Sequence, residues 1–514
     1  MRRRLLLVCA LVLLTALAGC NALQFGAQEA TGPGTVDDSL AADPSVSDPP
    51  RDVQGWEGGF WANESLAVTP EDGLNRSELD AVVARGMARV ELVRGVEFDR
   101  PVDVSLMNRS EYRDSLEEGG SGAEPTAAQD AAAAQQAAKY EALFLVGEST
   151  DAGKQESQNR ASTVQGFYSV REDRIVLISE SETPRMNEVT LAQELFHAYQ
   201  FRHALRQTPF PRNATQDQVT GLISLVEGDA NFVDALYERR CESRWDCLGD
   251  TPAGSGSDGG RSGGDRGDDS ANRSAASSDV HMGLYILSYF PYAEGEELVR
   301  DVYDDEGWRG VDKLYGDPPL SSRAVIHQRI GEHPPEDVAV PPRRSGSWER
   351  VGGEGRTGVT VGEAGVATMF AYTLYDDRQG SLVTREQFLN TDANGAVNAT
   401  SPLSYDLPPS AGWAGDRLVA YENADRRAYV WRTAWDSPAE AREFADAYRE
   451  LLRYHGAEKA GANRYVVDSG PFADAFAVGV DGSRVTVVNA PDEAALSRLS
   501  SSAANDYGTS NSTG

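Results

Sequence analysis

The chain has 514 residues, enough for two or three domains, and carries 80 acidic against 48 basic residues, a net charge of -32. Its lysines are Lys139, Lys154, Lys313 and Lys459, so the other 44 of the 48 basic residues are arginines. This excess of carboxylates leaves no basic patch that could release counterions from phosphates, which argues against a nucleic-acid partner.

The N-terminus has the pattern of an export signal. Arginines 2–4 precede an apolar run at residues 5–18 that is too short to span a bilayer. Leu17-Ala18-Gly19-Cys20 matches a lipobox, in which Cys20 receives lipid and becomes the mature N-terminus. Stable anchoring then needs two acyl chains. An ordinary signal peptide with a chance cysteine is the alternative, and the export route, general or twin-arginine, stays open.

We therefore predict an exported protein, lipid-anchored on the outer face of the cytoplasmic membrane. The membrane is then one partner, and envelope proteins or a surface layer are further candidates. Residues 1–20 form the predicted signal, and residues 21–55, rich in Gly, Asp, Ser and Pro, a flexible acidic tether. Residues 251–280 are a low-complexity insert that we expect to be disordered, as is the polar tail at 500–514.

Two cysteines remain after the signal and Cys20 are set aside. Cys241 and Cys247 are six apart, so outside the cytoplasm a local disulfide is expected, with a contribution to a zinc site as the weaker alternative. Sequons for N-glycosylation are typical of surface proteins, although some arise by chance. They occur at Asn63, Asn75, Asn108, Asn213, Asn272, Asn398 and Asn511.

Residues 56–341 form the first predicted domain, interrupted by the insert. Apolar periodicity predicts helices at residues 77–94, 127–140, 187–206, 217–240, 282–290 and 294–302. A strand is expected at 102–107 and a β-hairpin at 166–178.

Residues 346–499 form the second predicted domain. Strands are expected at 418–421, 428–435, 465–467, 475–480 and 485–488, the last two joined at Asp481-Gly482. The helix at 437–454 should begin with Ser437 as N-cap, Pro438 in the first turn and Glu440 completing a capping box. The fold class predicted for the whole chain is α+β.

The stretch most informative about chemistry is Gln193-Glu194-Leu195-Phe196-His197, an HExxH pattern with Gln in the first histidine position. Residues at i and i+4 on a helix face one metal ion, and the intervening Glu194 reaches its bound water as general base. A third ligand must come from elsewhere. Glu227 on the next helix is the candidate, because antiparallel packing of the two helices would bring it to His197.

These residues resemble a family of zincin-like proteins with HExxHALQDQHF followed by LVEGDA. Residues 193–203 read QELFHAYQFRH here, and residues 225–230 read LVEGDA. Further matches follow in the family's order: PPLSSRAVIH at 318–327, VGE at 361–363 and AGWAGDR at 411–417. A secreted haloarchaeal branch is the nearest in character, since the acidic, lysine-poor composition is also similar to that of halophilic proteins.

The resemblance implies a zincin-like helical domain with a small β-hairpin or sheet, plus a C-terminal α+β module. A hairpin at 166–178 would supply the edge strand before the active helix. Gln193 departs from the pattern, because an amide oxygen is a neutral and weak zinc donor compared with imidazole. Zinc is therefore expected to be weakly bound or absent.

Other residues near the motif have less specific roles. His203 stands at the spacing of a metzincin third ligand, but that arrangement needs a turn of the chain near Gln200, so we expect His203 outside the site. His327 is a more distant donor candidate. Asp229 either holds the backbone or orients His197. In the plain structural interpretation His197 is a half-buried histidine and Glu194 and Glu227 are paired or capped carboxylates.

Three hypotheses about function follow. The leading one is a surface lipoprotein with a degenerate peptidase-like domain that serves envelope binding or structure. The alternative is an active surface zinc peptidase with an unusual ligand set, Gln193, His197 and Glu227, with Glu194 as base. A solute-binding lipoprotein ranks lowest, because the strand-helix alternation of a two-lobed α/β binder is missing.

Overall fold

The computed structural model describes residues 48–68, 72–117, 126–249, 280–331, 334–341, 347–353, 358–376, 378–391, 395–398 and 401–504. Several predicted features lie outside these residues: the signal with Cys20, positions 21–47 of the tether, nearly all of the 251–280 insert, Asn272, Asn511 and the end of the tail. Within the described residues, no helix has the length and apolar character needed to cross a membrane.

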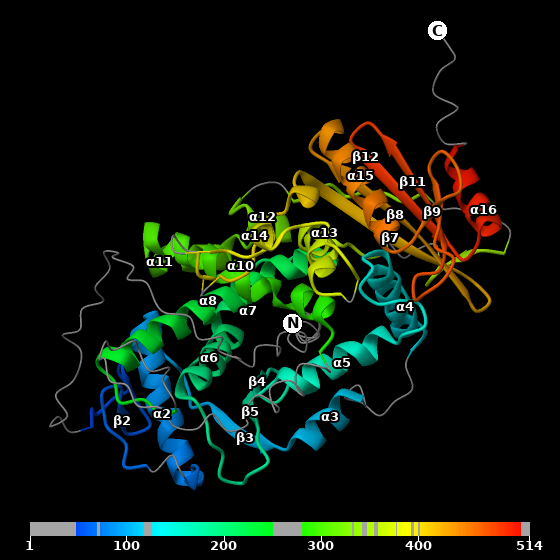
Figure 1. The fold of residues 1–514 in the computed structure, drawn as a ribbon. Helices are drawn as coiled ribbons and strands as arrows, with labels where there is room; N and C mark the ends of the chain where they lie inside the picture. The colour runs from blue at the N-terminus through cyan, green and yellow to red at the C-terminus, as the bar shows by residue number, and fades with distance from the viewer. Residues whose placement is uncertain are drawn as a thin grey trace, which may run out of the picture.

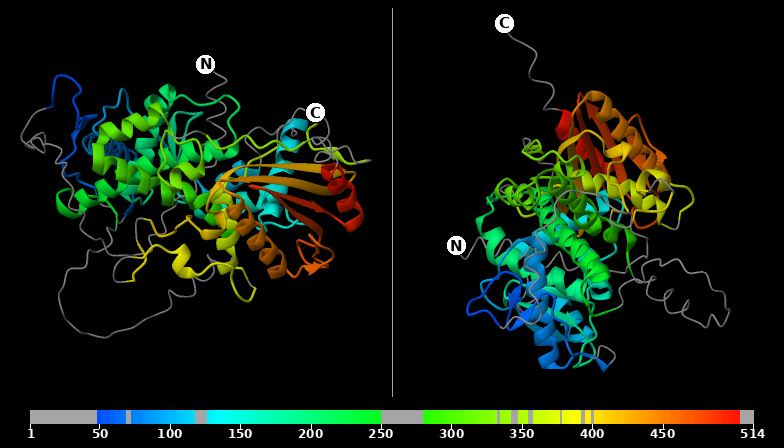
Figure 2. Two further views of the ribbon diagram at one scale, coloured as in Figure 1. Left: turned by 90° about the horizontal axis from the view of Figure 1, so that it is seen from above. Right: turned by 90° about the vertical axis from the view of Figure 1, so that its left-hand side faces the viewer.

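The fold is α+β, with helices and a small sheet at one end and a large antiparallel sheet at the other (Figures 1 and 2). The N-terminal part contains helices α2 (Arg76–Arg94), α3 (Arg109–Glu117), α4 (Ala127–Ala142) and α5 (Ala152–Thr163). Two short strands, β1 (Trp56–Glu57) and β2 (Phe60–Trp61), pair beside α2. The helices predicted at 77–94 and 127–140 are confirmed, whereas α3 and α5 had not been expected.

A three-stranded sheet in the order β3-β5-β4 lies next to α6 (Glu188–Tyr199). The predicted hairpin is formed by β4 (Gly166–Ser169) and β5 (Arg174–Ile178), and β3 (Asp103–Met107) pairs parallel to β5. Strand β4 is therefore an edge strand of this sheet.

Helix α6 continues through a π-helical turn, η3 (Gln200–Ala204), into α7 (Leu205–Gln207). Helix α8 (Gln216–Ser243) follows and begins with Thr215 in a capping box with Gln218. Helices α6 and α8 are antiparallel. Glu188 at the start of α6 contacts Tyr237 near the end of α8, whereas His197 near the end of α6 contacts Glu227 in the middle of α8. The predicted antiparallel packing of these two helices is confirmed.

Helix α8 packs most extensively on α10 (Met282–Glu306), and their backbones touch at glycines. A Cβ atom placed on Gly228 would lie 2.1 Å from the carbonyl oxygen of Gly295. We had predicted two helices at 282–290 and 294–302, and this was wrong, because α10 runs through Pro291. Proline disfavours a helix interior by about 3 kcal/mol, but here Phe290 and Tyr292 on either side are buried and anchor the segment.

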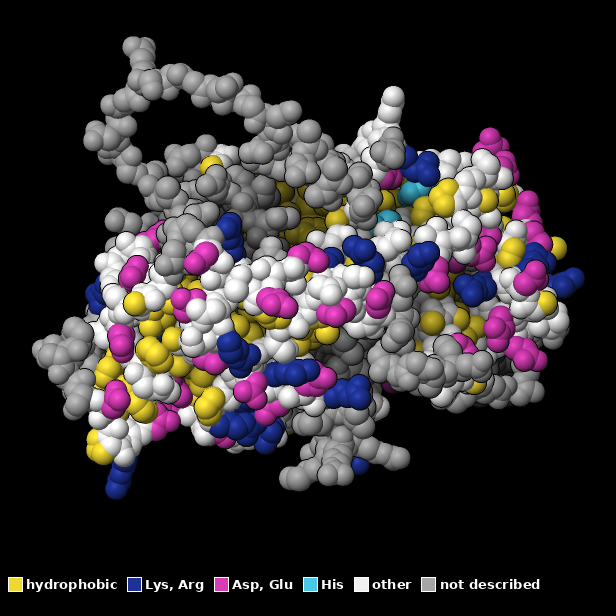
Figure 3. All heavy atoms as spheres, turned by 90° about the horizontal axis from the view of Figure 1, so that it is seen from below, with side chains coloured by type: hydrophobic (Ala, Val, Ile, Leu, Met, Phe, Trp, Pro, Cys, Tyr) yellow, Lys and Arg dark blue, Asp and Glu magenta, His cyan; other side chains and the backbone are white. Residues whose placement is uncertain are grey.

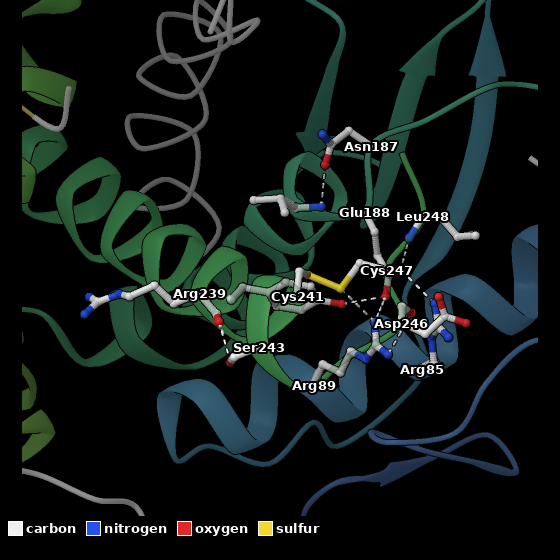
Figure 4. The surroundings of a disulfide bond; sticks show 12 residues. Arg85, Arg89, Asn187, Glu188, Arg239, Cys241, Ser243, Asp246, Cys247 and Leu248 are labelled. Atoms are coloured by element: carbon white, nitrogen blue, oxygen red, sulfur yellow. Dashed lines mark hydrogen bonds and ion pairs between the residues drawn. A yellow bond between two sulfur atoms is a disulfide. The ribbon is translucent and has the colours of Figure 1, made fainter. Parts of the chain in front are cut away.

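A buried carboxylate fixes the start of α6 (Figure 4). Glu188 is fully buried and pairs with Arg85 at 2.7 Å and Arg89 at 2.5 Å, both from α2. It also accepts hydrogen bonds from the Tyr237 hydroxyl and from the backbone N–H of Leu248. Four donors compensate the desolvation of one carboxylate, so α2, α6, α8 and the chain after the disulfide are held together here.

The predicted disulfide between Cys241 and Cys247 is confirmed, with 5.5 Å between the Cα atoms. It closes the loop between the end of α8 and Leu248, whose backbone binds Glu188. Arg89 donates hydrogen bonds to the Cys247 Sγ and to the Asp246 carbonyl. The two cysteines thus serve the buried junction of Figure 4 rather than a zinc site.

The C-terminal sheet is antiparallel throughout, in the order β6-β7-β8-β12-β11-β10-β9. Its strands are β6 (Glu349–Arg350), β7 (Trp413–Asn423), β8 (Arg426–Trp435), β9 (Glu458–Lys459), β10 (Arg464–Val466), β11 (Ala475–Asp481) and β12 (Arg484–Ala490). The predicted helix is α15 (Pro438–Tyr454), capped by Ser437. The Ser437 side chain accepts from the Ala439 and Glu440 backbones, but the reciprocal bond from Glu440 is not formed, so the predicted capping box is only half present.

Both faces of this sheet are covered. Leu418, Tyr429 and Trp431 face α15 and α4, whereas Val419 and Val430 face α16 (Glu493–Ala504). Burial on both faces accounts for the nearly continuous apolar runs of the central strands. Helix α16 also extends into the segment predicted as a loose tail from residue 500, which corrects that boundary.

The largest hydrophobic core crosses the boundary between the two predicted domains. Residues of α4 and α10 belong to the same buried cluster as the central strands of the C-terminal sheet. Gln135 of α4 adds two hydrogen bonds, one to the Val351 carbonyl and one from the Ala420 backbone N–H. Figure 1 shows α4 against the C-terminal sheet, far along the molecule from α2.

Three of the later motifs converge at the start of α8, together with the short helices α12 (Ser322–Ile326) and α13 (Gly362–Ala371). Asp217 accepts hydrogen bonds from the backbone N–H and the hydroxyl of Ser322. Gly362 has φ +80° and leaves no room for a Cβ atom beside Asp217. Asp416 of β7 accepts from the backbone of Val361 and Gly362. The motifs are therefore parts of one buried junction.

Four further short helices are described. They are α11 (Trp308–Gly316), α14 (Arg385–Phe388), η4 (Tyr372–Leu374) and η5 (Pro408–Ser410). On the face drawn in Figure 3, the described Arg and Lys side chains are interspersed with Asp and Glu side chains. The described part of this face therefore has no continuous basic surface.

The backbone contact between α8 and α10 can be tested with Gly228→Ala. The new Cβ atom meets backbone that cannot rotate away, so we expect the free energy of unfolding to fall by about 3 kcal/mol. Gly316→Ala is the matched control, since no atom lies within 4 Å of its Cβ position, and it should be neutral or stabilising by up to about 1 kcal/mol. Unfolding curves in one salt buffer measure both, and equal effects would contradict the contact.

Candidate functional site

The residues of the QExxH motif and Glu227 do meet between α6 and α8. The His197 Nε2 atom lies 3.4 Å from the Glu227 Oε2 atom, and both side chains are buried. This distance is too long for an ordinary N–H···O hydrogen bond, and neither oxygen of Glu227 has a hydrogen-bond partner among the described residues. The two side chains are therefore in close, buried contact without an ordinary hydrogen bond between them.

Gln193 and Glu194, the other two residues of the motif with polar side chains, have different hydrogen-bond partners. The Gln193 Nε2 atom donates to the Asn231 Oδ1 atom at 2.9 Å, one helical turn after Glu227 on α8. The Glu194 carboxylate receives a backbone hydrogen bond from Tyr168 of β4, the edge strand. The first-ligand position therefore holds the Gln193 amide, which is hydrogen-bonded to the Asn231 amide.

A chain of hydrogen bonds orients His197. Its Nδ1 atom lies 2.7 Å from the Gln200 Oε1 atom, and Gln200 Nε2 donates to the Val226 carbonyl and to the Tyr315 hydroxyl. Tyr315 in turn donates to Asp229, which is also held by Arg94. Asp229 is therefore linked to His197 through two hydrogen-bonding side chains, Tyr315 and Gln200.

Gln200 is a hydrogen-bond partner of His197 in the candidate site that sequence reasoning missed. It is completely buried and begins the π-helical turn η3, a feature that is frequent at functional sites. The signal available in the sequence was its position three residues after His197, on the same face of the helix.

The protonation of the site follows from burial and its carboxylates. Burial alone would lower the pKa of His197, but Glu227 and then Glu194 raise it to about 9. Burial raises the pKa of Glu194 to about 7, with His197 opposing and Glu227 reinforcing the shift. These shifts favour the protonated form of His197 at neutral pH and bring the pKa of Glu194 close to neutral pH.

Asp234 is a second residue that sequence reasoning missed. Burial, partly offset by His197 and reinforced by Glu194, raises the pKa of its carboxyl well above the usual value. Its Oδ1 atom is buried without a hydrogen-bond partner among the described residues. It lies two turns beyond Glu227 on α8, a spacing that could have indicated a shared helix face.

The fit of zinc to this site can be judged from the donors. Two ligands of one tetrahedral zinc ion lie about 3.4 Å apart, which His197 and Glu227 satisfy. The first histidine position of the motif holds Gln193, whose amide is a weak donor and is bound to Asn231. Among the described residues, no three His, Cys, Asp or Glu side chains are arranged to hold a metal ion. Because Gln193 is a weak donor whose amide is already bound to Asn231, the set Gln193, His197 and Glu227 does not suit tight zinc binding.

The other candidate histidines are not brought to the site. His203 lies in η3, stacks on Tyr199 and faces Asp99 at 3.4 Å. The chain does not turn at Gln200 as a metzincin ligand would require, because the π-helical turn continues the helix. His327 pairs with Glu363 at 2.9 Å between α12 and α13.

Two of the described sequon residues have side chains that bind the backbone. Asn75 is the N-cap of α2, and its side chain accepts from the backbones of Ser77 and Glu78. Asn108 similarly accepts from the Glu111 backbone. Asn213 and Asn398 are exposed and Asn63 is half-buried. Glycosylation at these positions stays a prediction.

Comparison with known proteins gives one match. A family model described as a domain of unknown function (DUF8575) matches residues 349–500. This segment extends from β6 into α16 and does not include α6 or α8. No curated protein and no solved structure matches the chain.

The ion pair predicts a particular pH dependence of stability. Because the pKa of His197 is raised from 6.5 to about 9, its stabilising contribution is complete below pH 6.5 and is lost as the pH rises through about 9. The stability difference between the wild type and Glu227→Gln should therefore shrink over this range, by up to about 3 kcal/mol.

Unfolding measured at a series of pH values checks this expectation. Glu172→Gln is the control, because Glu172 pairs with Arg174 at the surface and its effect should stay small and flat. A Glu227→Gln effect that does not change with pH would show that His197 is not charged in the folded protein.

Proposed function

We propose that the chain is a surface lipoprotein whose zincin-like helical unit no longer performs zinc-dependent catalysis. In this proposal α6 and α8 remain as a structural support, and the exposed surface together with the C-terminal domain serves envelope binding or structure. The observation that carries the proposal is the first-ligand position, where the Gln193 amide is bound to Asn231.

The electrostatics of the site also support it. In an active zinc site His197 must be neutral to offer a lone pair to the metal. Here the charges of Glu227 and then Glu194 favour the protonated form of His197 and raise its pKa to about 9. The imidazolium supplies the positive charge that the buried carboxylates would otherwise lack.

The retained general base supports the alternative, an active zinc peptidase. The pKa of Glu194, about 7, is suited to taking a proton near neutral pH. The unpartnered oxygens of Glu227 and their distance to His197 also suit metal ligands. In such an enzyme His197 and Glu227 would bind the ion, and Glu194 would receive the proton of the attacking water.

Metal content distinguishes the two. Purified in multimolar salt, which screens the charge of -32, the wild type should hold far less than one zinc ion per chain. Gln193→His replaces a weak neutral donor with imidazole, so it should bring the zinc content close to one per chain. His197→Ala in the Gln193→His background is the matched control and should remove the metal again.

Measurements on the same purified proteins can also contradict the proposal. Near-stoichiometric zinc in the wild type, lost in Glu227→Ala, together with peptide hydrolysis lost in Glu194→Gln, would establish the peptidase.

A further inference from the structure

A cavity of about 120 Å³, partly open to solvent, lies where α4, α5, α8, α10 and α13 meet. Its wall combines apolar side chains, among them Ile223 and Leu287, with polar ones that include Lys139 and Asp217. Asp217 precedes Glu227 by roughly 15 Å along α8, at 1.5 Å per residue. The cavity is therefore separate from the His197–Glu227 pair.

Lys139 is an unusual residue in this chain. Arginine supplies nearly all of the positive charge, and Lys154, Lys313 and Lys459 are exposed, whereas Lys139 is buried in the cavity wall. Its Nζ atom donates one hydrogen bond within the described residues, to Gln216 Oε1 at 3.1 Å, although an ammonium group carries three donors. Two of the three N–H donors of a charged Lys139 would therefore have no acceptor among the described residues.

Burial lowers the pKa of Lys139 to about 8, against the opposing effect of Asp416, Asp217 and Glu156. About a tenth of this amine is therefore neutral and nucleophilic at pH 7, compared with well under a thousandth for an exposed lysine. Lys139 therefore has an appreciable fraction of neutral, nucleophilic amine and lies in the wall of a cavity.

The carboxyl group of Asp217, in the wall of the same cavity, can provide a proton. Its Oδ1 atom is used by Ser322, but its Oδ2 atom is buried without a hydrogen-bond partner among the described residues. Burial raises the pKa of this carboxyl to about 7, with the hydrogen bonds from Ser322 opposing. The motif junction around Ser322 and Gly362 holds the carboxyl rigidly in the cavity wall.

The charge of the cavity wall indicates the class of ligand. Its basic side chains are Lys139 and Arg160, and its acidic ones are Glu156 and Asp217. Opposite charges are balanced, so a neutral polar group fits better than an anion or a cation. The apolar side chains suit a small hydrocarbon body attached to that group.

We propose that this cavity binds a small aldehyde or ketone with an apolar body, and that Lys139 captures its carbonyl carbon as an imine. The neutral Nζ adds to the carbonyl carbon, and one N–H proton passes to the oxygen to give a carbinolamine. Protonated Asp217 then donates to the hydroxyl, which leaves as water while the nitrogen lone pair forms the C=N bond. The products are a protonated imine, water and the Asp217 carboxylate, and no oxidant or reductant is consumed.

Reductive trapping on the full chain tests this inference. The folded protein is incubated at pH 7 with 3-methylbutanal and cyanoborohydride, which reduces the protonated imine to a stable amine, and peptide mapping locates the label. We expect Lys139 to be labelled about tenfold faster than Lys154, since its larger neutral fraction outweighs its lower basicity. Its rate should saturate with aldehyde concentration, because binding precedes reaction.

Two variants and a control separate binding from general reactivity. Lys139→Arg should lose the fast label, while Lys154→Arg, at an exposed lysine, should keep it. Leu287→Phe, which narrows the cavity, should slow labelling of Lys139 and leave that of Lys154 unchanged. Peptide mapping of the wild type needs no variant, so the test holds even if Lys139→Arg does not fold. Labelling of Lys139 that is no faster than that of Lys154, or that does not saturate, would overturn the inference.

Discussion

The backbone contact between Gly228 of α8 and Gly295 of α10 is the constraint on which the rest of the structure depends. No Cβ atom can enter this contact, so α8 and α10 cross at one fixed place. Because α8 is one continuous helix of 28 residues, this crossing sets the direction of both its ends. Glu227 then faces His197 on α6, and Asp217 faces the junction of α12 and α13. The glycine in the LVEGDA motif is thus explained by packing rather than by chemistry.

Buried carboxylates whose oxygens all have hydrogen-bond donors or cationic partners can be distinguished from those that keep an unpartnered oxygen. The first group is structural, and the second contains the candidate functional residues. Glu188 has four donors and Asp229 is held by Arg94 and Tyr315, so both carboxylates are fully compensated parts of the architecture. Glu227 and Asp217 differ, since each keeps buried oxygen without a hydrogen-bond partner among the described residues. Such groups cost free energy unless a charge or ligand compensates them. For Glu227 the imidazolium of His197 does so, and for Asp217 a raised pKa does so in part.

Local patterns in the sequence predicted most of the helices, the hairpin, the disulfide and the meeting of His197 with Glu227. Each depends on residues close in sequence or on a helix pair joined by a short loop. The prediction failed at Pro291, where burial of its neighbours outweighs the local preference against helix. It also missed the partners of the site, Gln200, Asn231 and Asp234, and the cavity around Lys139, because tertiary packing alone brings them there. An Ala-rich helix such as α4 gives no sign in the sequence that it covers a sheet formed almost 300 residues later.

The charge of His197 is the most direct test of the central claim that an ion pair has replaced a metal site. The imidazole nitrogen shifts of the chain's six histidines can be measured by NMR at neutral pH, with His197→Gln assigning the resonance, before and after addition of zinc. The account predicts that both nitrogens of His197 carry protons and that zinc leaves their shifts unchanged. A neutral ring whose Nε2 resonance moves when zinc is added would contradict it.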